Sequence, residues 1–218
     1  MIIVTALLAA TVAIQAPAPA APTATGPIVV LETTMGNIRI ALDEARAPIT
    51  VKNFLAYARA GHYDGTIFHR VIPRFMVQGG GMDAAMKEKA TRPPIKNEAA
   101  NKVRNDRGTV AMARTAEPNS ATAQFFVNVK NNASLDYGIG GAGYAVFGTV
   151  IEGMDVVDRI VAVPTTSKGG HQDVPMTPVL INRARVEGAA RTPAAAPADG
   201  SAVEKPAGAR PVSMPRRN

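Results

Sequence analysis

The chain has 218 residues, of which 46% are hydrophobic and 19% are charged, a composition that fits one globular domain with a sizeable core. It contains no cysteine, which excludes disulfides, thiol catalysis and zinc–thiolate sites. The net charge of +7 is scattered without a long basic run, so nucleic-acid binding, which normally needs a clustered basic face, is not expected.

The first 26 residues have the pattern of a secretory signal peptide. Residues 2–14 form an apolar run of 13, shorter than the roughly 20 residues that span a membrane. Small residues follow the run, and Ala18-Pro19-Ala20 fits an A-x-A-like cleavage site. The usual positive charge ahead of the run is absent, because no lysine or arginine precedes Arg39.

These features predict a signal peptide over residues 1–20 and a short linker over residues 21–27. We therefore expect a periplasmic protein with no membrane association after cleavage. The alternatives are an uncleaved anchor or a mis-assigned start. The location would be cytoplasmic if this segment is not a functional signal.

The segment 28–188 is expected to form one domain. Its start contains two β-branched runs within residues 27–42, which read as a hairpin that turns near Met35-Gly36. Further strand-like runs lie near residues 66–72, 75–80, 109–113, 124–130, 144–151 and 178–186.

Two helices are predicted between these strands. Residues 47–63 form the first, since Pro48 suits a first helical turn and Gly61 suits a C-terminal stop. Its expected inward face carries Val51, Phe54, Leu55 and Ala58. Residues 153–163 form the second, with an expected inward face of Met154, Val157 and Val161. About eight strands and two helices predict a closed barrel plugged at its ends.

The C-terminal segment, residues 189–218, is rich in alanine and proline and nearly lacks large apolar side chains. Such a segment cannot bury enough apolar surface to offset the entropy lost on ordering. We therefore predict that it is disordered.

Several other chemistries are weakly supported. The G-x-G-x-x-G match at residues 138–143 is followed by a strand-like run rather than a helix, which argues against dinucleotide binding. Ser120 and Ser134 have no neighbouring histidine in the sequence, which disfavours nucleophilic catalysis. No metal site or cofactor is expected, because no metal-ligand spacing relates the three histidines, His62, His69 and His171.

Two stretches carry the strongest functional signal. Residues 68–81, "FHRVIPRFMVQGGG", read as a strand, a kink and a strand that place Arg70 and Gln78 among large apolar side chains. Residues 110–126 read as a strand, a small-residue loop and a strand in which Gln124 and Phe126 share one face. A cation and amides among apolar side chains, with no obvious acid, base or nucleophile beside them, indicate chemistry without proton transfer.

In this order and spacing, "FHRVIPRFMVQGG" and "SATAQFF" resemble the cyclophilin-type peptidyl-prolyl cis–trans isomerases. The resemblance continues through "LDY" and "GYAVFGTVIEGMDVVDRI" and covers nearly all of residues 28–187. The runs "MART" and "HQDVP" are similar to the bacterial branch. The resemblance implies a mainly β fold, an eight-stranded closed antiparallel barrel capped by two α-helices, in agreement with the elements predicted above.

The resemblance also implies roles for eleven residues. It assigns the family's catalytic arginine to Arg70, acting with Phe75 and Gln78. The implied pocket for the proline ring is Phe75, Met76, Phe126 and Leu135, and the implied peptide-binding amides are Gln78 and Gln124. The remaining substrate-binding positions are Ala113, Arg114, Thr115 and Tyr144, the last of which is a histidine in many relatives.

The function implied is rotation about Xaa-Pro bonds in unfolded or partly folded polypeptides that contain proline, performed by a monomer. Ser134 stands where many relatives carry an aromatic residue before Leu135, so weak cyclosporin binding is expected. The alternative interpretation is a proline-peptide binding module or folding chaperone with little turnover, since the same pocket would serve both. Arg70 favours the enzyme, because binding the ring alone would not need it.

The N-terminal pattern generates the first testable prediction. Cleavage after Ala20 should give a mature protein that starts near Ala21 and is recovered from the periplasm. Mass spectrometry of the protein from fractionated cells measures both properties. An intact Met1 in a cytoplasmic fraction would refute the prediction.

Overall fold

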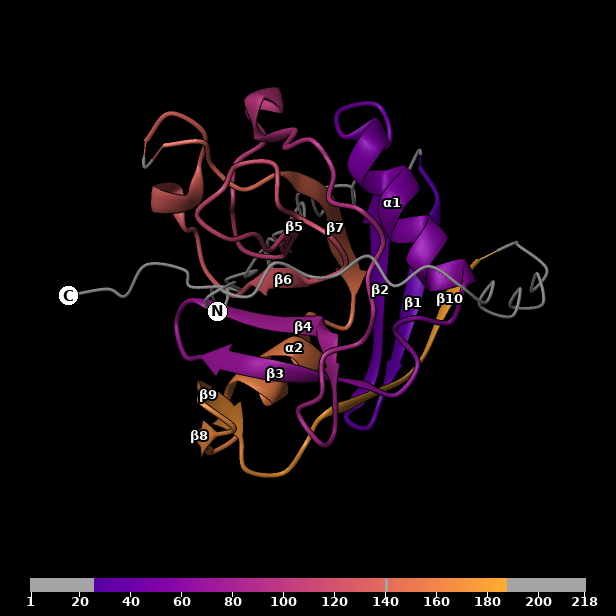
Figure 1. Ribbon diagram of the computed structural model, residues 1–218, viewed down its shortest axis with the longest axis vertical. Coiled ribbons are helices and arrows are strands. Elements are labelled where there is room, and N and C mark those ends of the chain that lie inside the picture. The colour runs from indigo at the N-terminus through magenta and orange to yellow at the C-terminus, as the bar shows by residue number, and fades with distance from the viewer. Residues whose placement is uncertain (1–25, 140, 188–218) are drawn as a thin grey trace, which may run out of the picture.

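The computed structural model describes residues 26–139 and 141–187. Eight strands close into an antiparallel barrel in the order β1-β10-β3-β4-β6-β5-β7-β2, and β8 and β9 form a separate two-stranded sheet (Figure 1). The predicted barrel is therefore confirmed. The predicted signal peptide, most of the linker and the predicted disordered tail lie outside the described residues.

The strands have short, well-defined bounds. The barrel strands are β1 (Ile28–Thr33), β2 (Gly36–Leu42), β3 (Thr66–Ile72), β4 (Met76–Asp83), β5 (Thr109–Met112), β6 (Phe125–Asn128), β7 (Val146–Glu152) and β10 (Leu180–Val186). The separate sheet is β8 (Thr165–Lys168) and β9 (His171–Pro175). The helices are α1 (Pro48–Arg59), α2 (Met154–Val161) and the 3-10 turns η1 (Ala99–Asn101) and η2 (Ala133–Leu135).

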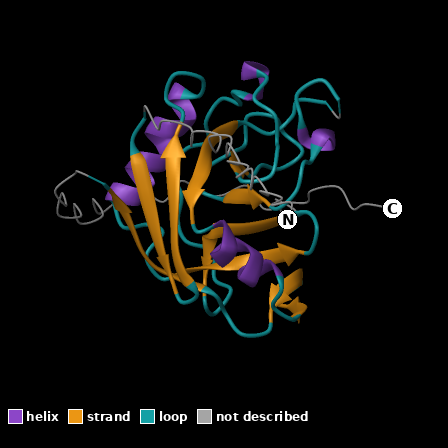
Figure 2. Cartoon of the chain, turned by 180° about the vertical axis from the view of Figure 1, so that it is seen from behind, coloured by secondary structure: helices purple, strands orange, loops and turns teal. Residues whose placement is uncertain are grey.

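Closure of the barrel joins the two ends of the domain. β1 pairs with β2, its neighbour in sequence, and also with β10, the last strand. Figure 2 shows these strands side by side, with α1 and α2 at different ends of the barrel. α1 contacts β10 and β7, whereas α2 contacts β2, β3 and β4.

The interior of the barrel is filled by alternate strand residues and by one face of α1. Phe54 of α1 packs edge-on against Phe125 of β6, with ring centroids 5.5 Å apart. Phe54 also lies 5.0 Å from Tyr63 and 5.0 Å from Phe147 of β7, centroid to centroid. These aromatic rings are fully buried and join the helix to two strands of the barrel wall and to the turn before β3.

α1 starts with Pro48, as predicted, but its first turn is capped by a distant residue. The Glu98 carboxylate accepts hydrogen bonds from the backbone N–H of Ile49 at 3.1 Å and of Thr50 at 2.8 Å. A carboxylate at this position satisfies free amide donors and complements the positive end of the helix dipole. The cap therefore ties the segment between β4 and β5 to the helix.

α2 follows β7 after Gly153 alone, which has a φ of 88°. A side chain there would place its Cβ 2.2 Å from the carbonyl oxygen of Asn37. Glycine is therefore required for α2 to turn back so closely over β2.

The two helices differ in detail from the prediction. α1 ends at Arg59, earlier than residue 63, but its four predicted inward residues are all buried. In α2 the buried residues are Val156, Val157 and Ile160, whereas the predicted Met154 and Val161 are only partly buried. Neither described helix is long and apolar enough to cross a membrane.

Candidate active site

The ladders of four adjacent strands place Arg70, Gln78 and Phe126 in one row. Arg70 of β3 lies opposite Gln78 of β4, and Gln78 lies opposite Phe126 of β6. The row continues to Ala111 of β5. Directly opposite residues share a face of the sheet, so backbone pairing fixes a guanidinium, an amide and an aromatic ring beside one another.

This row lies on the face of the sheet that points away from the barrel interior. Side chains alternate between the two faces along a strand. Val71, Val77, Phe125 and Val127, the sequence neighbours of the row, are buried in the barrel core. The same strands therefore build the core with one face and a second apolar surface with the other.

We call this second surface the outer cluster. Its buried members are Phe75, Met76, Ala111, Ala113, Phe126, Leu135, Tyr144 and Val146. The rings of Phe126 and Tyr144 meet edge to face, with centroids 5.7 Å apart. A patch of rings and small side chains beside a half-buried guanidinium suits a compact apolar ring.

Two amides lie beside the outer cluster. Nε2 of Gln78 donates to Oε1 of Gln124 at 2.9 Å, which fixes the orientation of both side chains. A Cβ on Gly81 would lie 2.5 Å from the Gln124 side chain. The glycine run at the end of β4 therefore makes room for this amide pair.

The loop after β5 is held by its own side chains. Nε of Arg114 donates to the carbonyl oxygen of Gly143 at 2.9 Å, and its guanidinium lies 4.4 Å from the ring centroid of Tyr144. The Ser120 hydroxyl accepts from the hydroxyl of Thr115 at 2.8 Å and donates to the carbonyl of Glu117. Ser120 thus closes the loop.

Burial raises the pKa of the Tyr144 phenol, and the nearby Arg114 and Arg70 guanidiniums oppose that rise. Tyr144 therefore stays protonated near neutral pH and keeps its hydroxyl as a donor.

A break in the β3–β4 register between Phe68 and Arg70 leaves His69 in a bulge, so strict alternation along β3 does not place His69 opposite Arg70. His69 is 4% exposed and its imidazole interacts with the Gln124 side chain. Burial, together with the nearby His171, lowers the pKa of His69 from 6.5 to about 4. The imidazole is therefore neutral near neutral pH. Across residues 26–139 and 141–187, no group of three or more His, Cys, Asp or Glu side chains could hold a metal ion.

Comparison with known proteins matches this architecture to one family. The family profile described as "Cyclophilin type peptidyl-prolyl cis-trans isomerase/CLD" matches residues 28–186. The chain belongs to the cyclophilin-type peptidyl-prolyl cis–trans isomerases. The prediction of an isomerase of this family, made from the two sequence blocks, is thereby confirmed.

Bacterial relatives agree with this cyclophilin assignment. The chain is 56% identical over 170 residues to peptidyl-prolyl cis-trans isomerase A of Dickeya dadantii, covering 78% of this chain and 88% of that protein. It is 60% identical over 161 residues to an isomerase of Streptomyces antibioticus, covering 72% and 97%. Isomerase B of Escherichia coli is 54% identical over 162 residues, covering 73% and 99%.

Solved structures share the cyclophilin fold. A cyclophilin from Hirschia baltica aligns with a TM-score of 0.58 at 26% identity, covering 72% of this chain and 73% of that one. A Cryptosporidium parvum isomerase, solved in the presence of the dipeptide Ala-Pro, aligns with a TM-score of 0.62 at 24% identity. That alignment covers 74% of this chain and 99% of the other.

The structure gathers the sequence-predicted residues of this cyclophilin into one region. Six of them lie in the outer cluster: Phe75, Met76, Ala113, Phe126, Leu135 and Tyr144. Arg70 and Gln78 adjoin it through the strand row, and Gln124 through its bond to Gln78. Arg114 joins it through Tyr144, whereas Thr115 lies in the loop beyond and contacts Ser120. Their functional roles stay predictions.

Sequence reasoning missed other residues that build this region. Ala111 and Val146 belong to the outer cluster, and strand alternation from Ala113 and Tyr144 could have found them. Three buried asparagines, Asn105, Asn128 and Asn132, lie behind the cluster. No local sequence pattern marks them as a group, because Asn105 lies 23 residues before Asn128, although Asn128 and Asn132 are only four residues apart.

The lowered pKa of His69 predicts acid sensitivity. In the unfolded chain the imidazole protonates near pH 6.5, and in the folded chain only near pH 4. The unfolded state therefore binds more protons between these values, and stability is lost as pH falls through this window. At about 1.4 kcal/mol per pH unit, the free energy of unfolding should fall by about 3 kcal/mol between pH 7 and pH 4.

Urea unfolding at several pH values measures this loss, and an NMR titration locates it at His69. His62, whose pKa burial also lowers, contributes in the same direction, so His69→Asn should flatten the profile without abolishing its slope. A His69 imidazole that titrates near 6.5 in the folded protein would contradict the prediction.

Proposed function

We propose that this cyclophilin accelerates rotation about Xaa-Pro peptide bonds, with Arg70 as the catalytic donor and the outer cluster as the site of the proline ring. The observation that carries the proposal is the strand row Arg70–Gln78–Phe126, which sets an oriented cation and an amide against a buried ring. The bacterial relatives named as peptidyl-prolyl isomerases support it.

The reaction needs no nucleophile or proton transfer. Rotation about the Xaa-Pro bond is slow because it breaks amide resonance, a barrier of about 18–20 kcal/mol. Loss of resonance leaves a lone pair on the proline nitrogen. A donor aimed at that nitrogen binds the twisted state better than the planar one, and this difference lowers the barrier.

Arg70 suits the role of that donor. Its guanidinium stays protonated at all physiological pH values and presents several N–H groups in one rigid plane. The backbone of Arg70 belongs to β3, and the pairing of β3 with β4 fixes the position from which its side chain extends. Burial keeps the neighbouring His69 neutral near neutral pH, so this histidine adds no second charge beside the guanidinium.

Substrate positioning is assigned to the surrounding groups. Phe75, Met76, Phe126 and Leu135 would surround the ring, while Gln78 and Gln124 would bind the peptide backbone and the loop Ala113–Thr115 would receive the chain. When the proline ring of the substrate is held in place, the rest of the peptide moves relative to it, so that rotation occurs about the Xaa-Pro bond.

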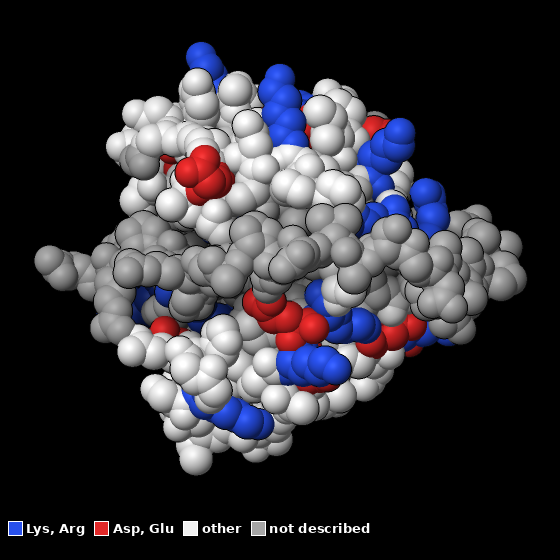
Figure 3. Space-filling model, in the orientation of Figure 1, with Lys and Arg blue, Asp and Glu red and all other residues white. Residues whose placement is uncertain are grey.

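We further propose that the substrates are unfolded or partly folded polypeptides that contain proline, and that the protein acts in the periplasm as a monomer. The N-terminal apolar run and Ala18-Pro19-Ala20 support export. On the face shown in Figure 3, basic and acidic side chains are interspersed among the described residues, which favours a polypeptide over a nucleic acid as partner.

Substitution of Arg70 tests the mechanism. Arg70→Ala should lower turnover by roughly 10²-fold or more, if the charged hydrogen bond contributes about 3 kcal/mol in the transition state. Arg70→Lys should not restore turnover, because lysine keeps the charge but loses the planar fork. Exchange NMR on a short Xaa-Pro peptide measures turnover, and titration with the same peptide measures affinity.

Two further variants sharpen that experiment. Arg159→Lys alters an exposed arginine on α2, which pairs with Asp155, and should leave turnover unchanged. Phe126→Ala should weaken peptide affinity as well as turnover, because it removes the centre of the outer cluster. Near-normal catalysis by Arg70→Ala would remove the arginine from the mechanism and favour a proline-peptide binding module.

Ser134 predicts weak cyclosporin binding. Its side chain is exposed beside the buried Leu135, where an aromatic residue would extend the apolar wall. Ser134→Trp should therefore tighten cyclosporin binding, and Ser134→Ala, which adds no wall, should not. Calorimetric titration compares the three proteins, and nanomolar affinity of the unmodified protein would contradict the prediction.

A further inference from the structure

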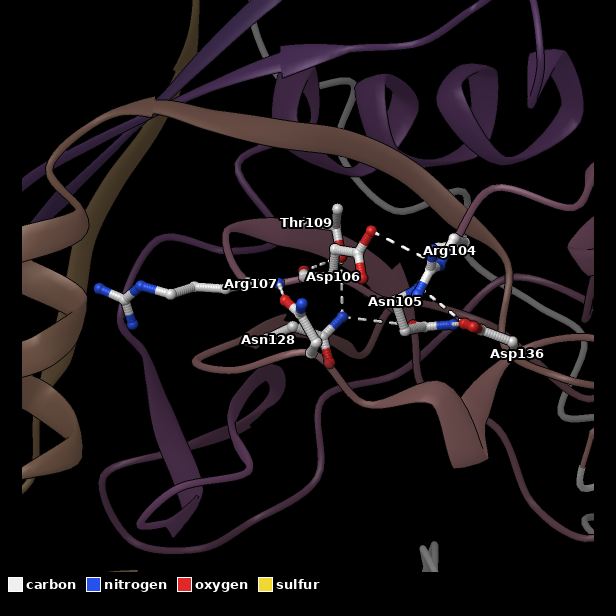
Figure 4. A network of polar contacts seen from close by, with 8 residues as sticks. Arg104, Asn105, Asp106, Arg107, Thr109, Asn128 and Asp136 are labelled. Carbon is white, nitrogen blue, oxygen red and sulfur yellow. Dashed lines mark hydrogen bonds and ion pairs between the residues drawn. The ribbon is translucent and has the colours of Figure 1, made fainter.

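Three asparagines form a buried chain of amides behind the outer cluster. Asn105 is 1% exposed, and Asn128 and Asn132 are 0% exposed. Nδ2 of Asn132 donates to Oδ1 of Asn128 at 2.7 Å, and Nδ2 of Asn128 donates to Oδ1 of Asn105 at 3.3 Å. Figure 4 shows Asn105 and Asn128 meeting at the middle of this network, with Thr109 and Asp136 beside them.

Both ends of the chain finish on backbone carbonyls of the outer cluster. At one end, Nδ2 of Asn132 donates to the carbonyl oxygen of Phe75 at 2.8 Å. At the other end, Nδ2 of Asn105 lies 3.2 Å from the carbonyl oxygen of Leu135, 3.4 Å from that of Tyr144 and 3.1 Å from Oδ1 of Asp136.

Backbone bonds reinforce these two ends. The N–H of Leu135 donates to the carbonyl of Asn132 at 2.8 Å, and the N–H of Tyr144 donates to the carbonyl of Leu135 at 3.0 Å. The N–H of Asn132 donates to the carbonyl of Asn105 at 2.8 Å. The side-chain amides and the cluster backbone thus form one connected network.

The residues at these ends lie outside the paired barrel strands, although backbone bonds with Ile72 and Val129 also hold Phe75. Arg70, Gln78 and Phe126 lie inside paired strands, which set their positions. Phe75 precedes β4, Leu135 lies in η2 and Tyr144 precedes β7. Segments outside the strands need other bonds to hold them, and a chain of buried amides resists distortion because breaking one of its hydrogen bonds leaves a further buried polar group unsatisfied.

We propose that Asn105, Asn128 and Asn132 are positioning residues, whose amide chain sets the distance between Phe75 and the pair Leu135 and Tyr144 and so the fit of the proline ring. The inference rests on the proposed function, since it assigns these three residues to the ring site. It divides the proposed site into two parts. Strand pairing holds the catalytic donor Arg70, and the asparagine amides hold the residues that surround the proline ring.

The separation predicts a distinctive kinetic result. Asn105→Ala and Asn132→Ala should each raise KM and the peptide dissociation constant about fivefold or more, the effect of losing about one net hydrogen bond. Turnover at saturation should change by less than about twofold, because Arg70 keeps its strand pairing. The double variant should raise KM by less than the product of the single effects, since either change breaks the same chain.

Thr66→Val supplies the matched control. Thr66 is fully buried at the start of β3, and its hydroxyl donates to the carbonyl of Tyr63 at 2.7 Å, away from the outer cluster. The variant loses a buried hydrogen bond at similar volume and should unfold more easily with KM unchanged. Urea unfolding of all variants then shows whether stability alone accounts for a change in KM.

A milder variant and a second readout cover a failure to fold. Asn105→Ser retains a small polar group, and hydrogen exchange reports the Tyr144 amide directly. In the Asn105 variants this amide should exchange faster than amides of the barrel strands, whereas in Thr66→Val it should not. Faster exchange together with the rise in KM supports the proposal.

Three outcomes overturn the inference. The first is a KM equal to that of Thr66→Val at equal loss of stability, and the second is a loss of turnover with KM unchanged. The third is Tyr144 exchange that follows global unfolding in every variant. Failure of the proposed function is a separate result, because the unmodified protein would then show no isomerase activity at all.

Discussion

The two faces of the β3–β4–β6–β5 sheet are the constraint on which this molecule depends. Adjacent residues on a strand point to opposite sides, so Val77 and Phe125 enter the barrel while Gln78 and Phe126 enter the outer cluster. A shift of one residue in the pairing would turn the side chains of the proposed site into the core and the core side chains outward. The packing of the barrel and the geometry of the site are therefore specified by the same register.

The site proposed around Arg70 relies on no acid–base pair, which is consistent with the chemistry of bond rotation. His69 and Tyr144, which both interact electrostatically with Arg70, have pKa values displaced away from neutral pH. Burial keeps His69 neutral, and it keeps Tyr144 protonated against the pull of Arg114 and Arg70. The charges of His69 and Tyr144 are then constant across the neutral range, and His69 gains its proton in the folded chain only as the pH falls towards about 4.

Much of the fold and the site could be predicted from the sequence, for identifiable reasons. Strong period-2 runs predicted the barrel strands, and Pro48 and Gly61 bracketed the first helix. The residues that the family resemblance assigned to the site lie close together, because the pairing of β3, β4 and β6 brings their motifs side by side. The β8–β9 sheet was missed, because residues 165–168, "TTSK", are polar and mostly exposed and lack the apolar alternation of a strand.

The bonds between distant segments lay beyond sequence reasoning. Glu98 caps a helix that begins about fifty residues earlier, and no local pattern relates the two. The same holds for Asn105, Asn128 and Asn132, each of which reads alone as an ordinary polar loop or strand-end residue. Only the folded chain shows that their amides touch one another and the backbone of Phe75, Leu135 and Tyr144.

The pairing of β1 with β10 has a consequence for synthesis on the ribosome. During synthesis β1 can pair with β2 as soon as β2 has left the ribosome. The other edge of β1 finds its partner, β10, only when residues 180–186 have left the ribosome. Until then the nascent chain carries an open strand edge made of Ile28, Val29, Val30 and Leu31, the kind of edge that recruits other unpaired strands. A protein proposed to help others fold thus completes its own fold only with its last strand.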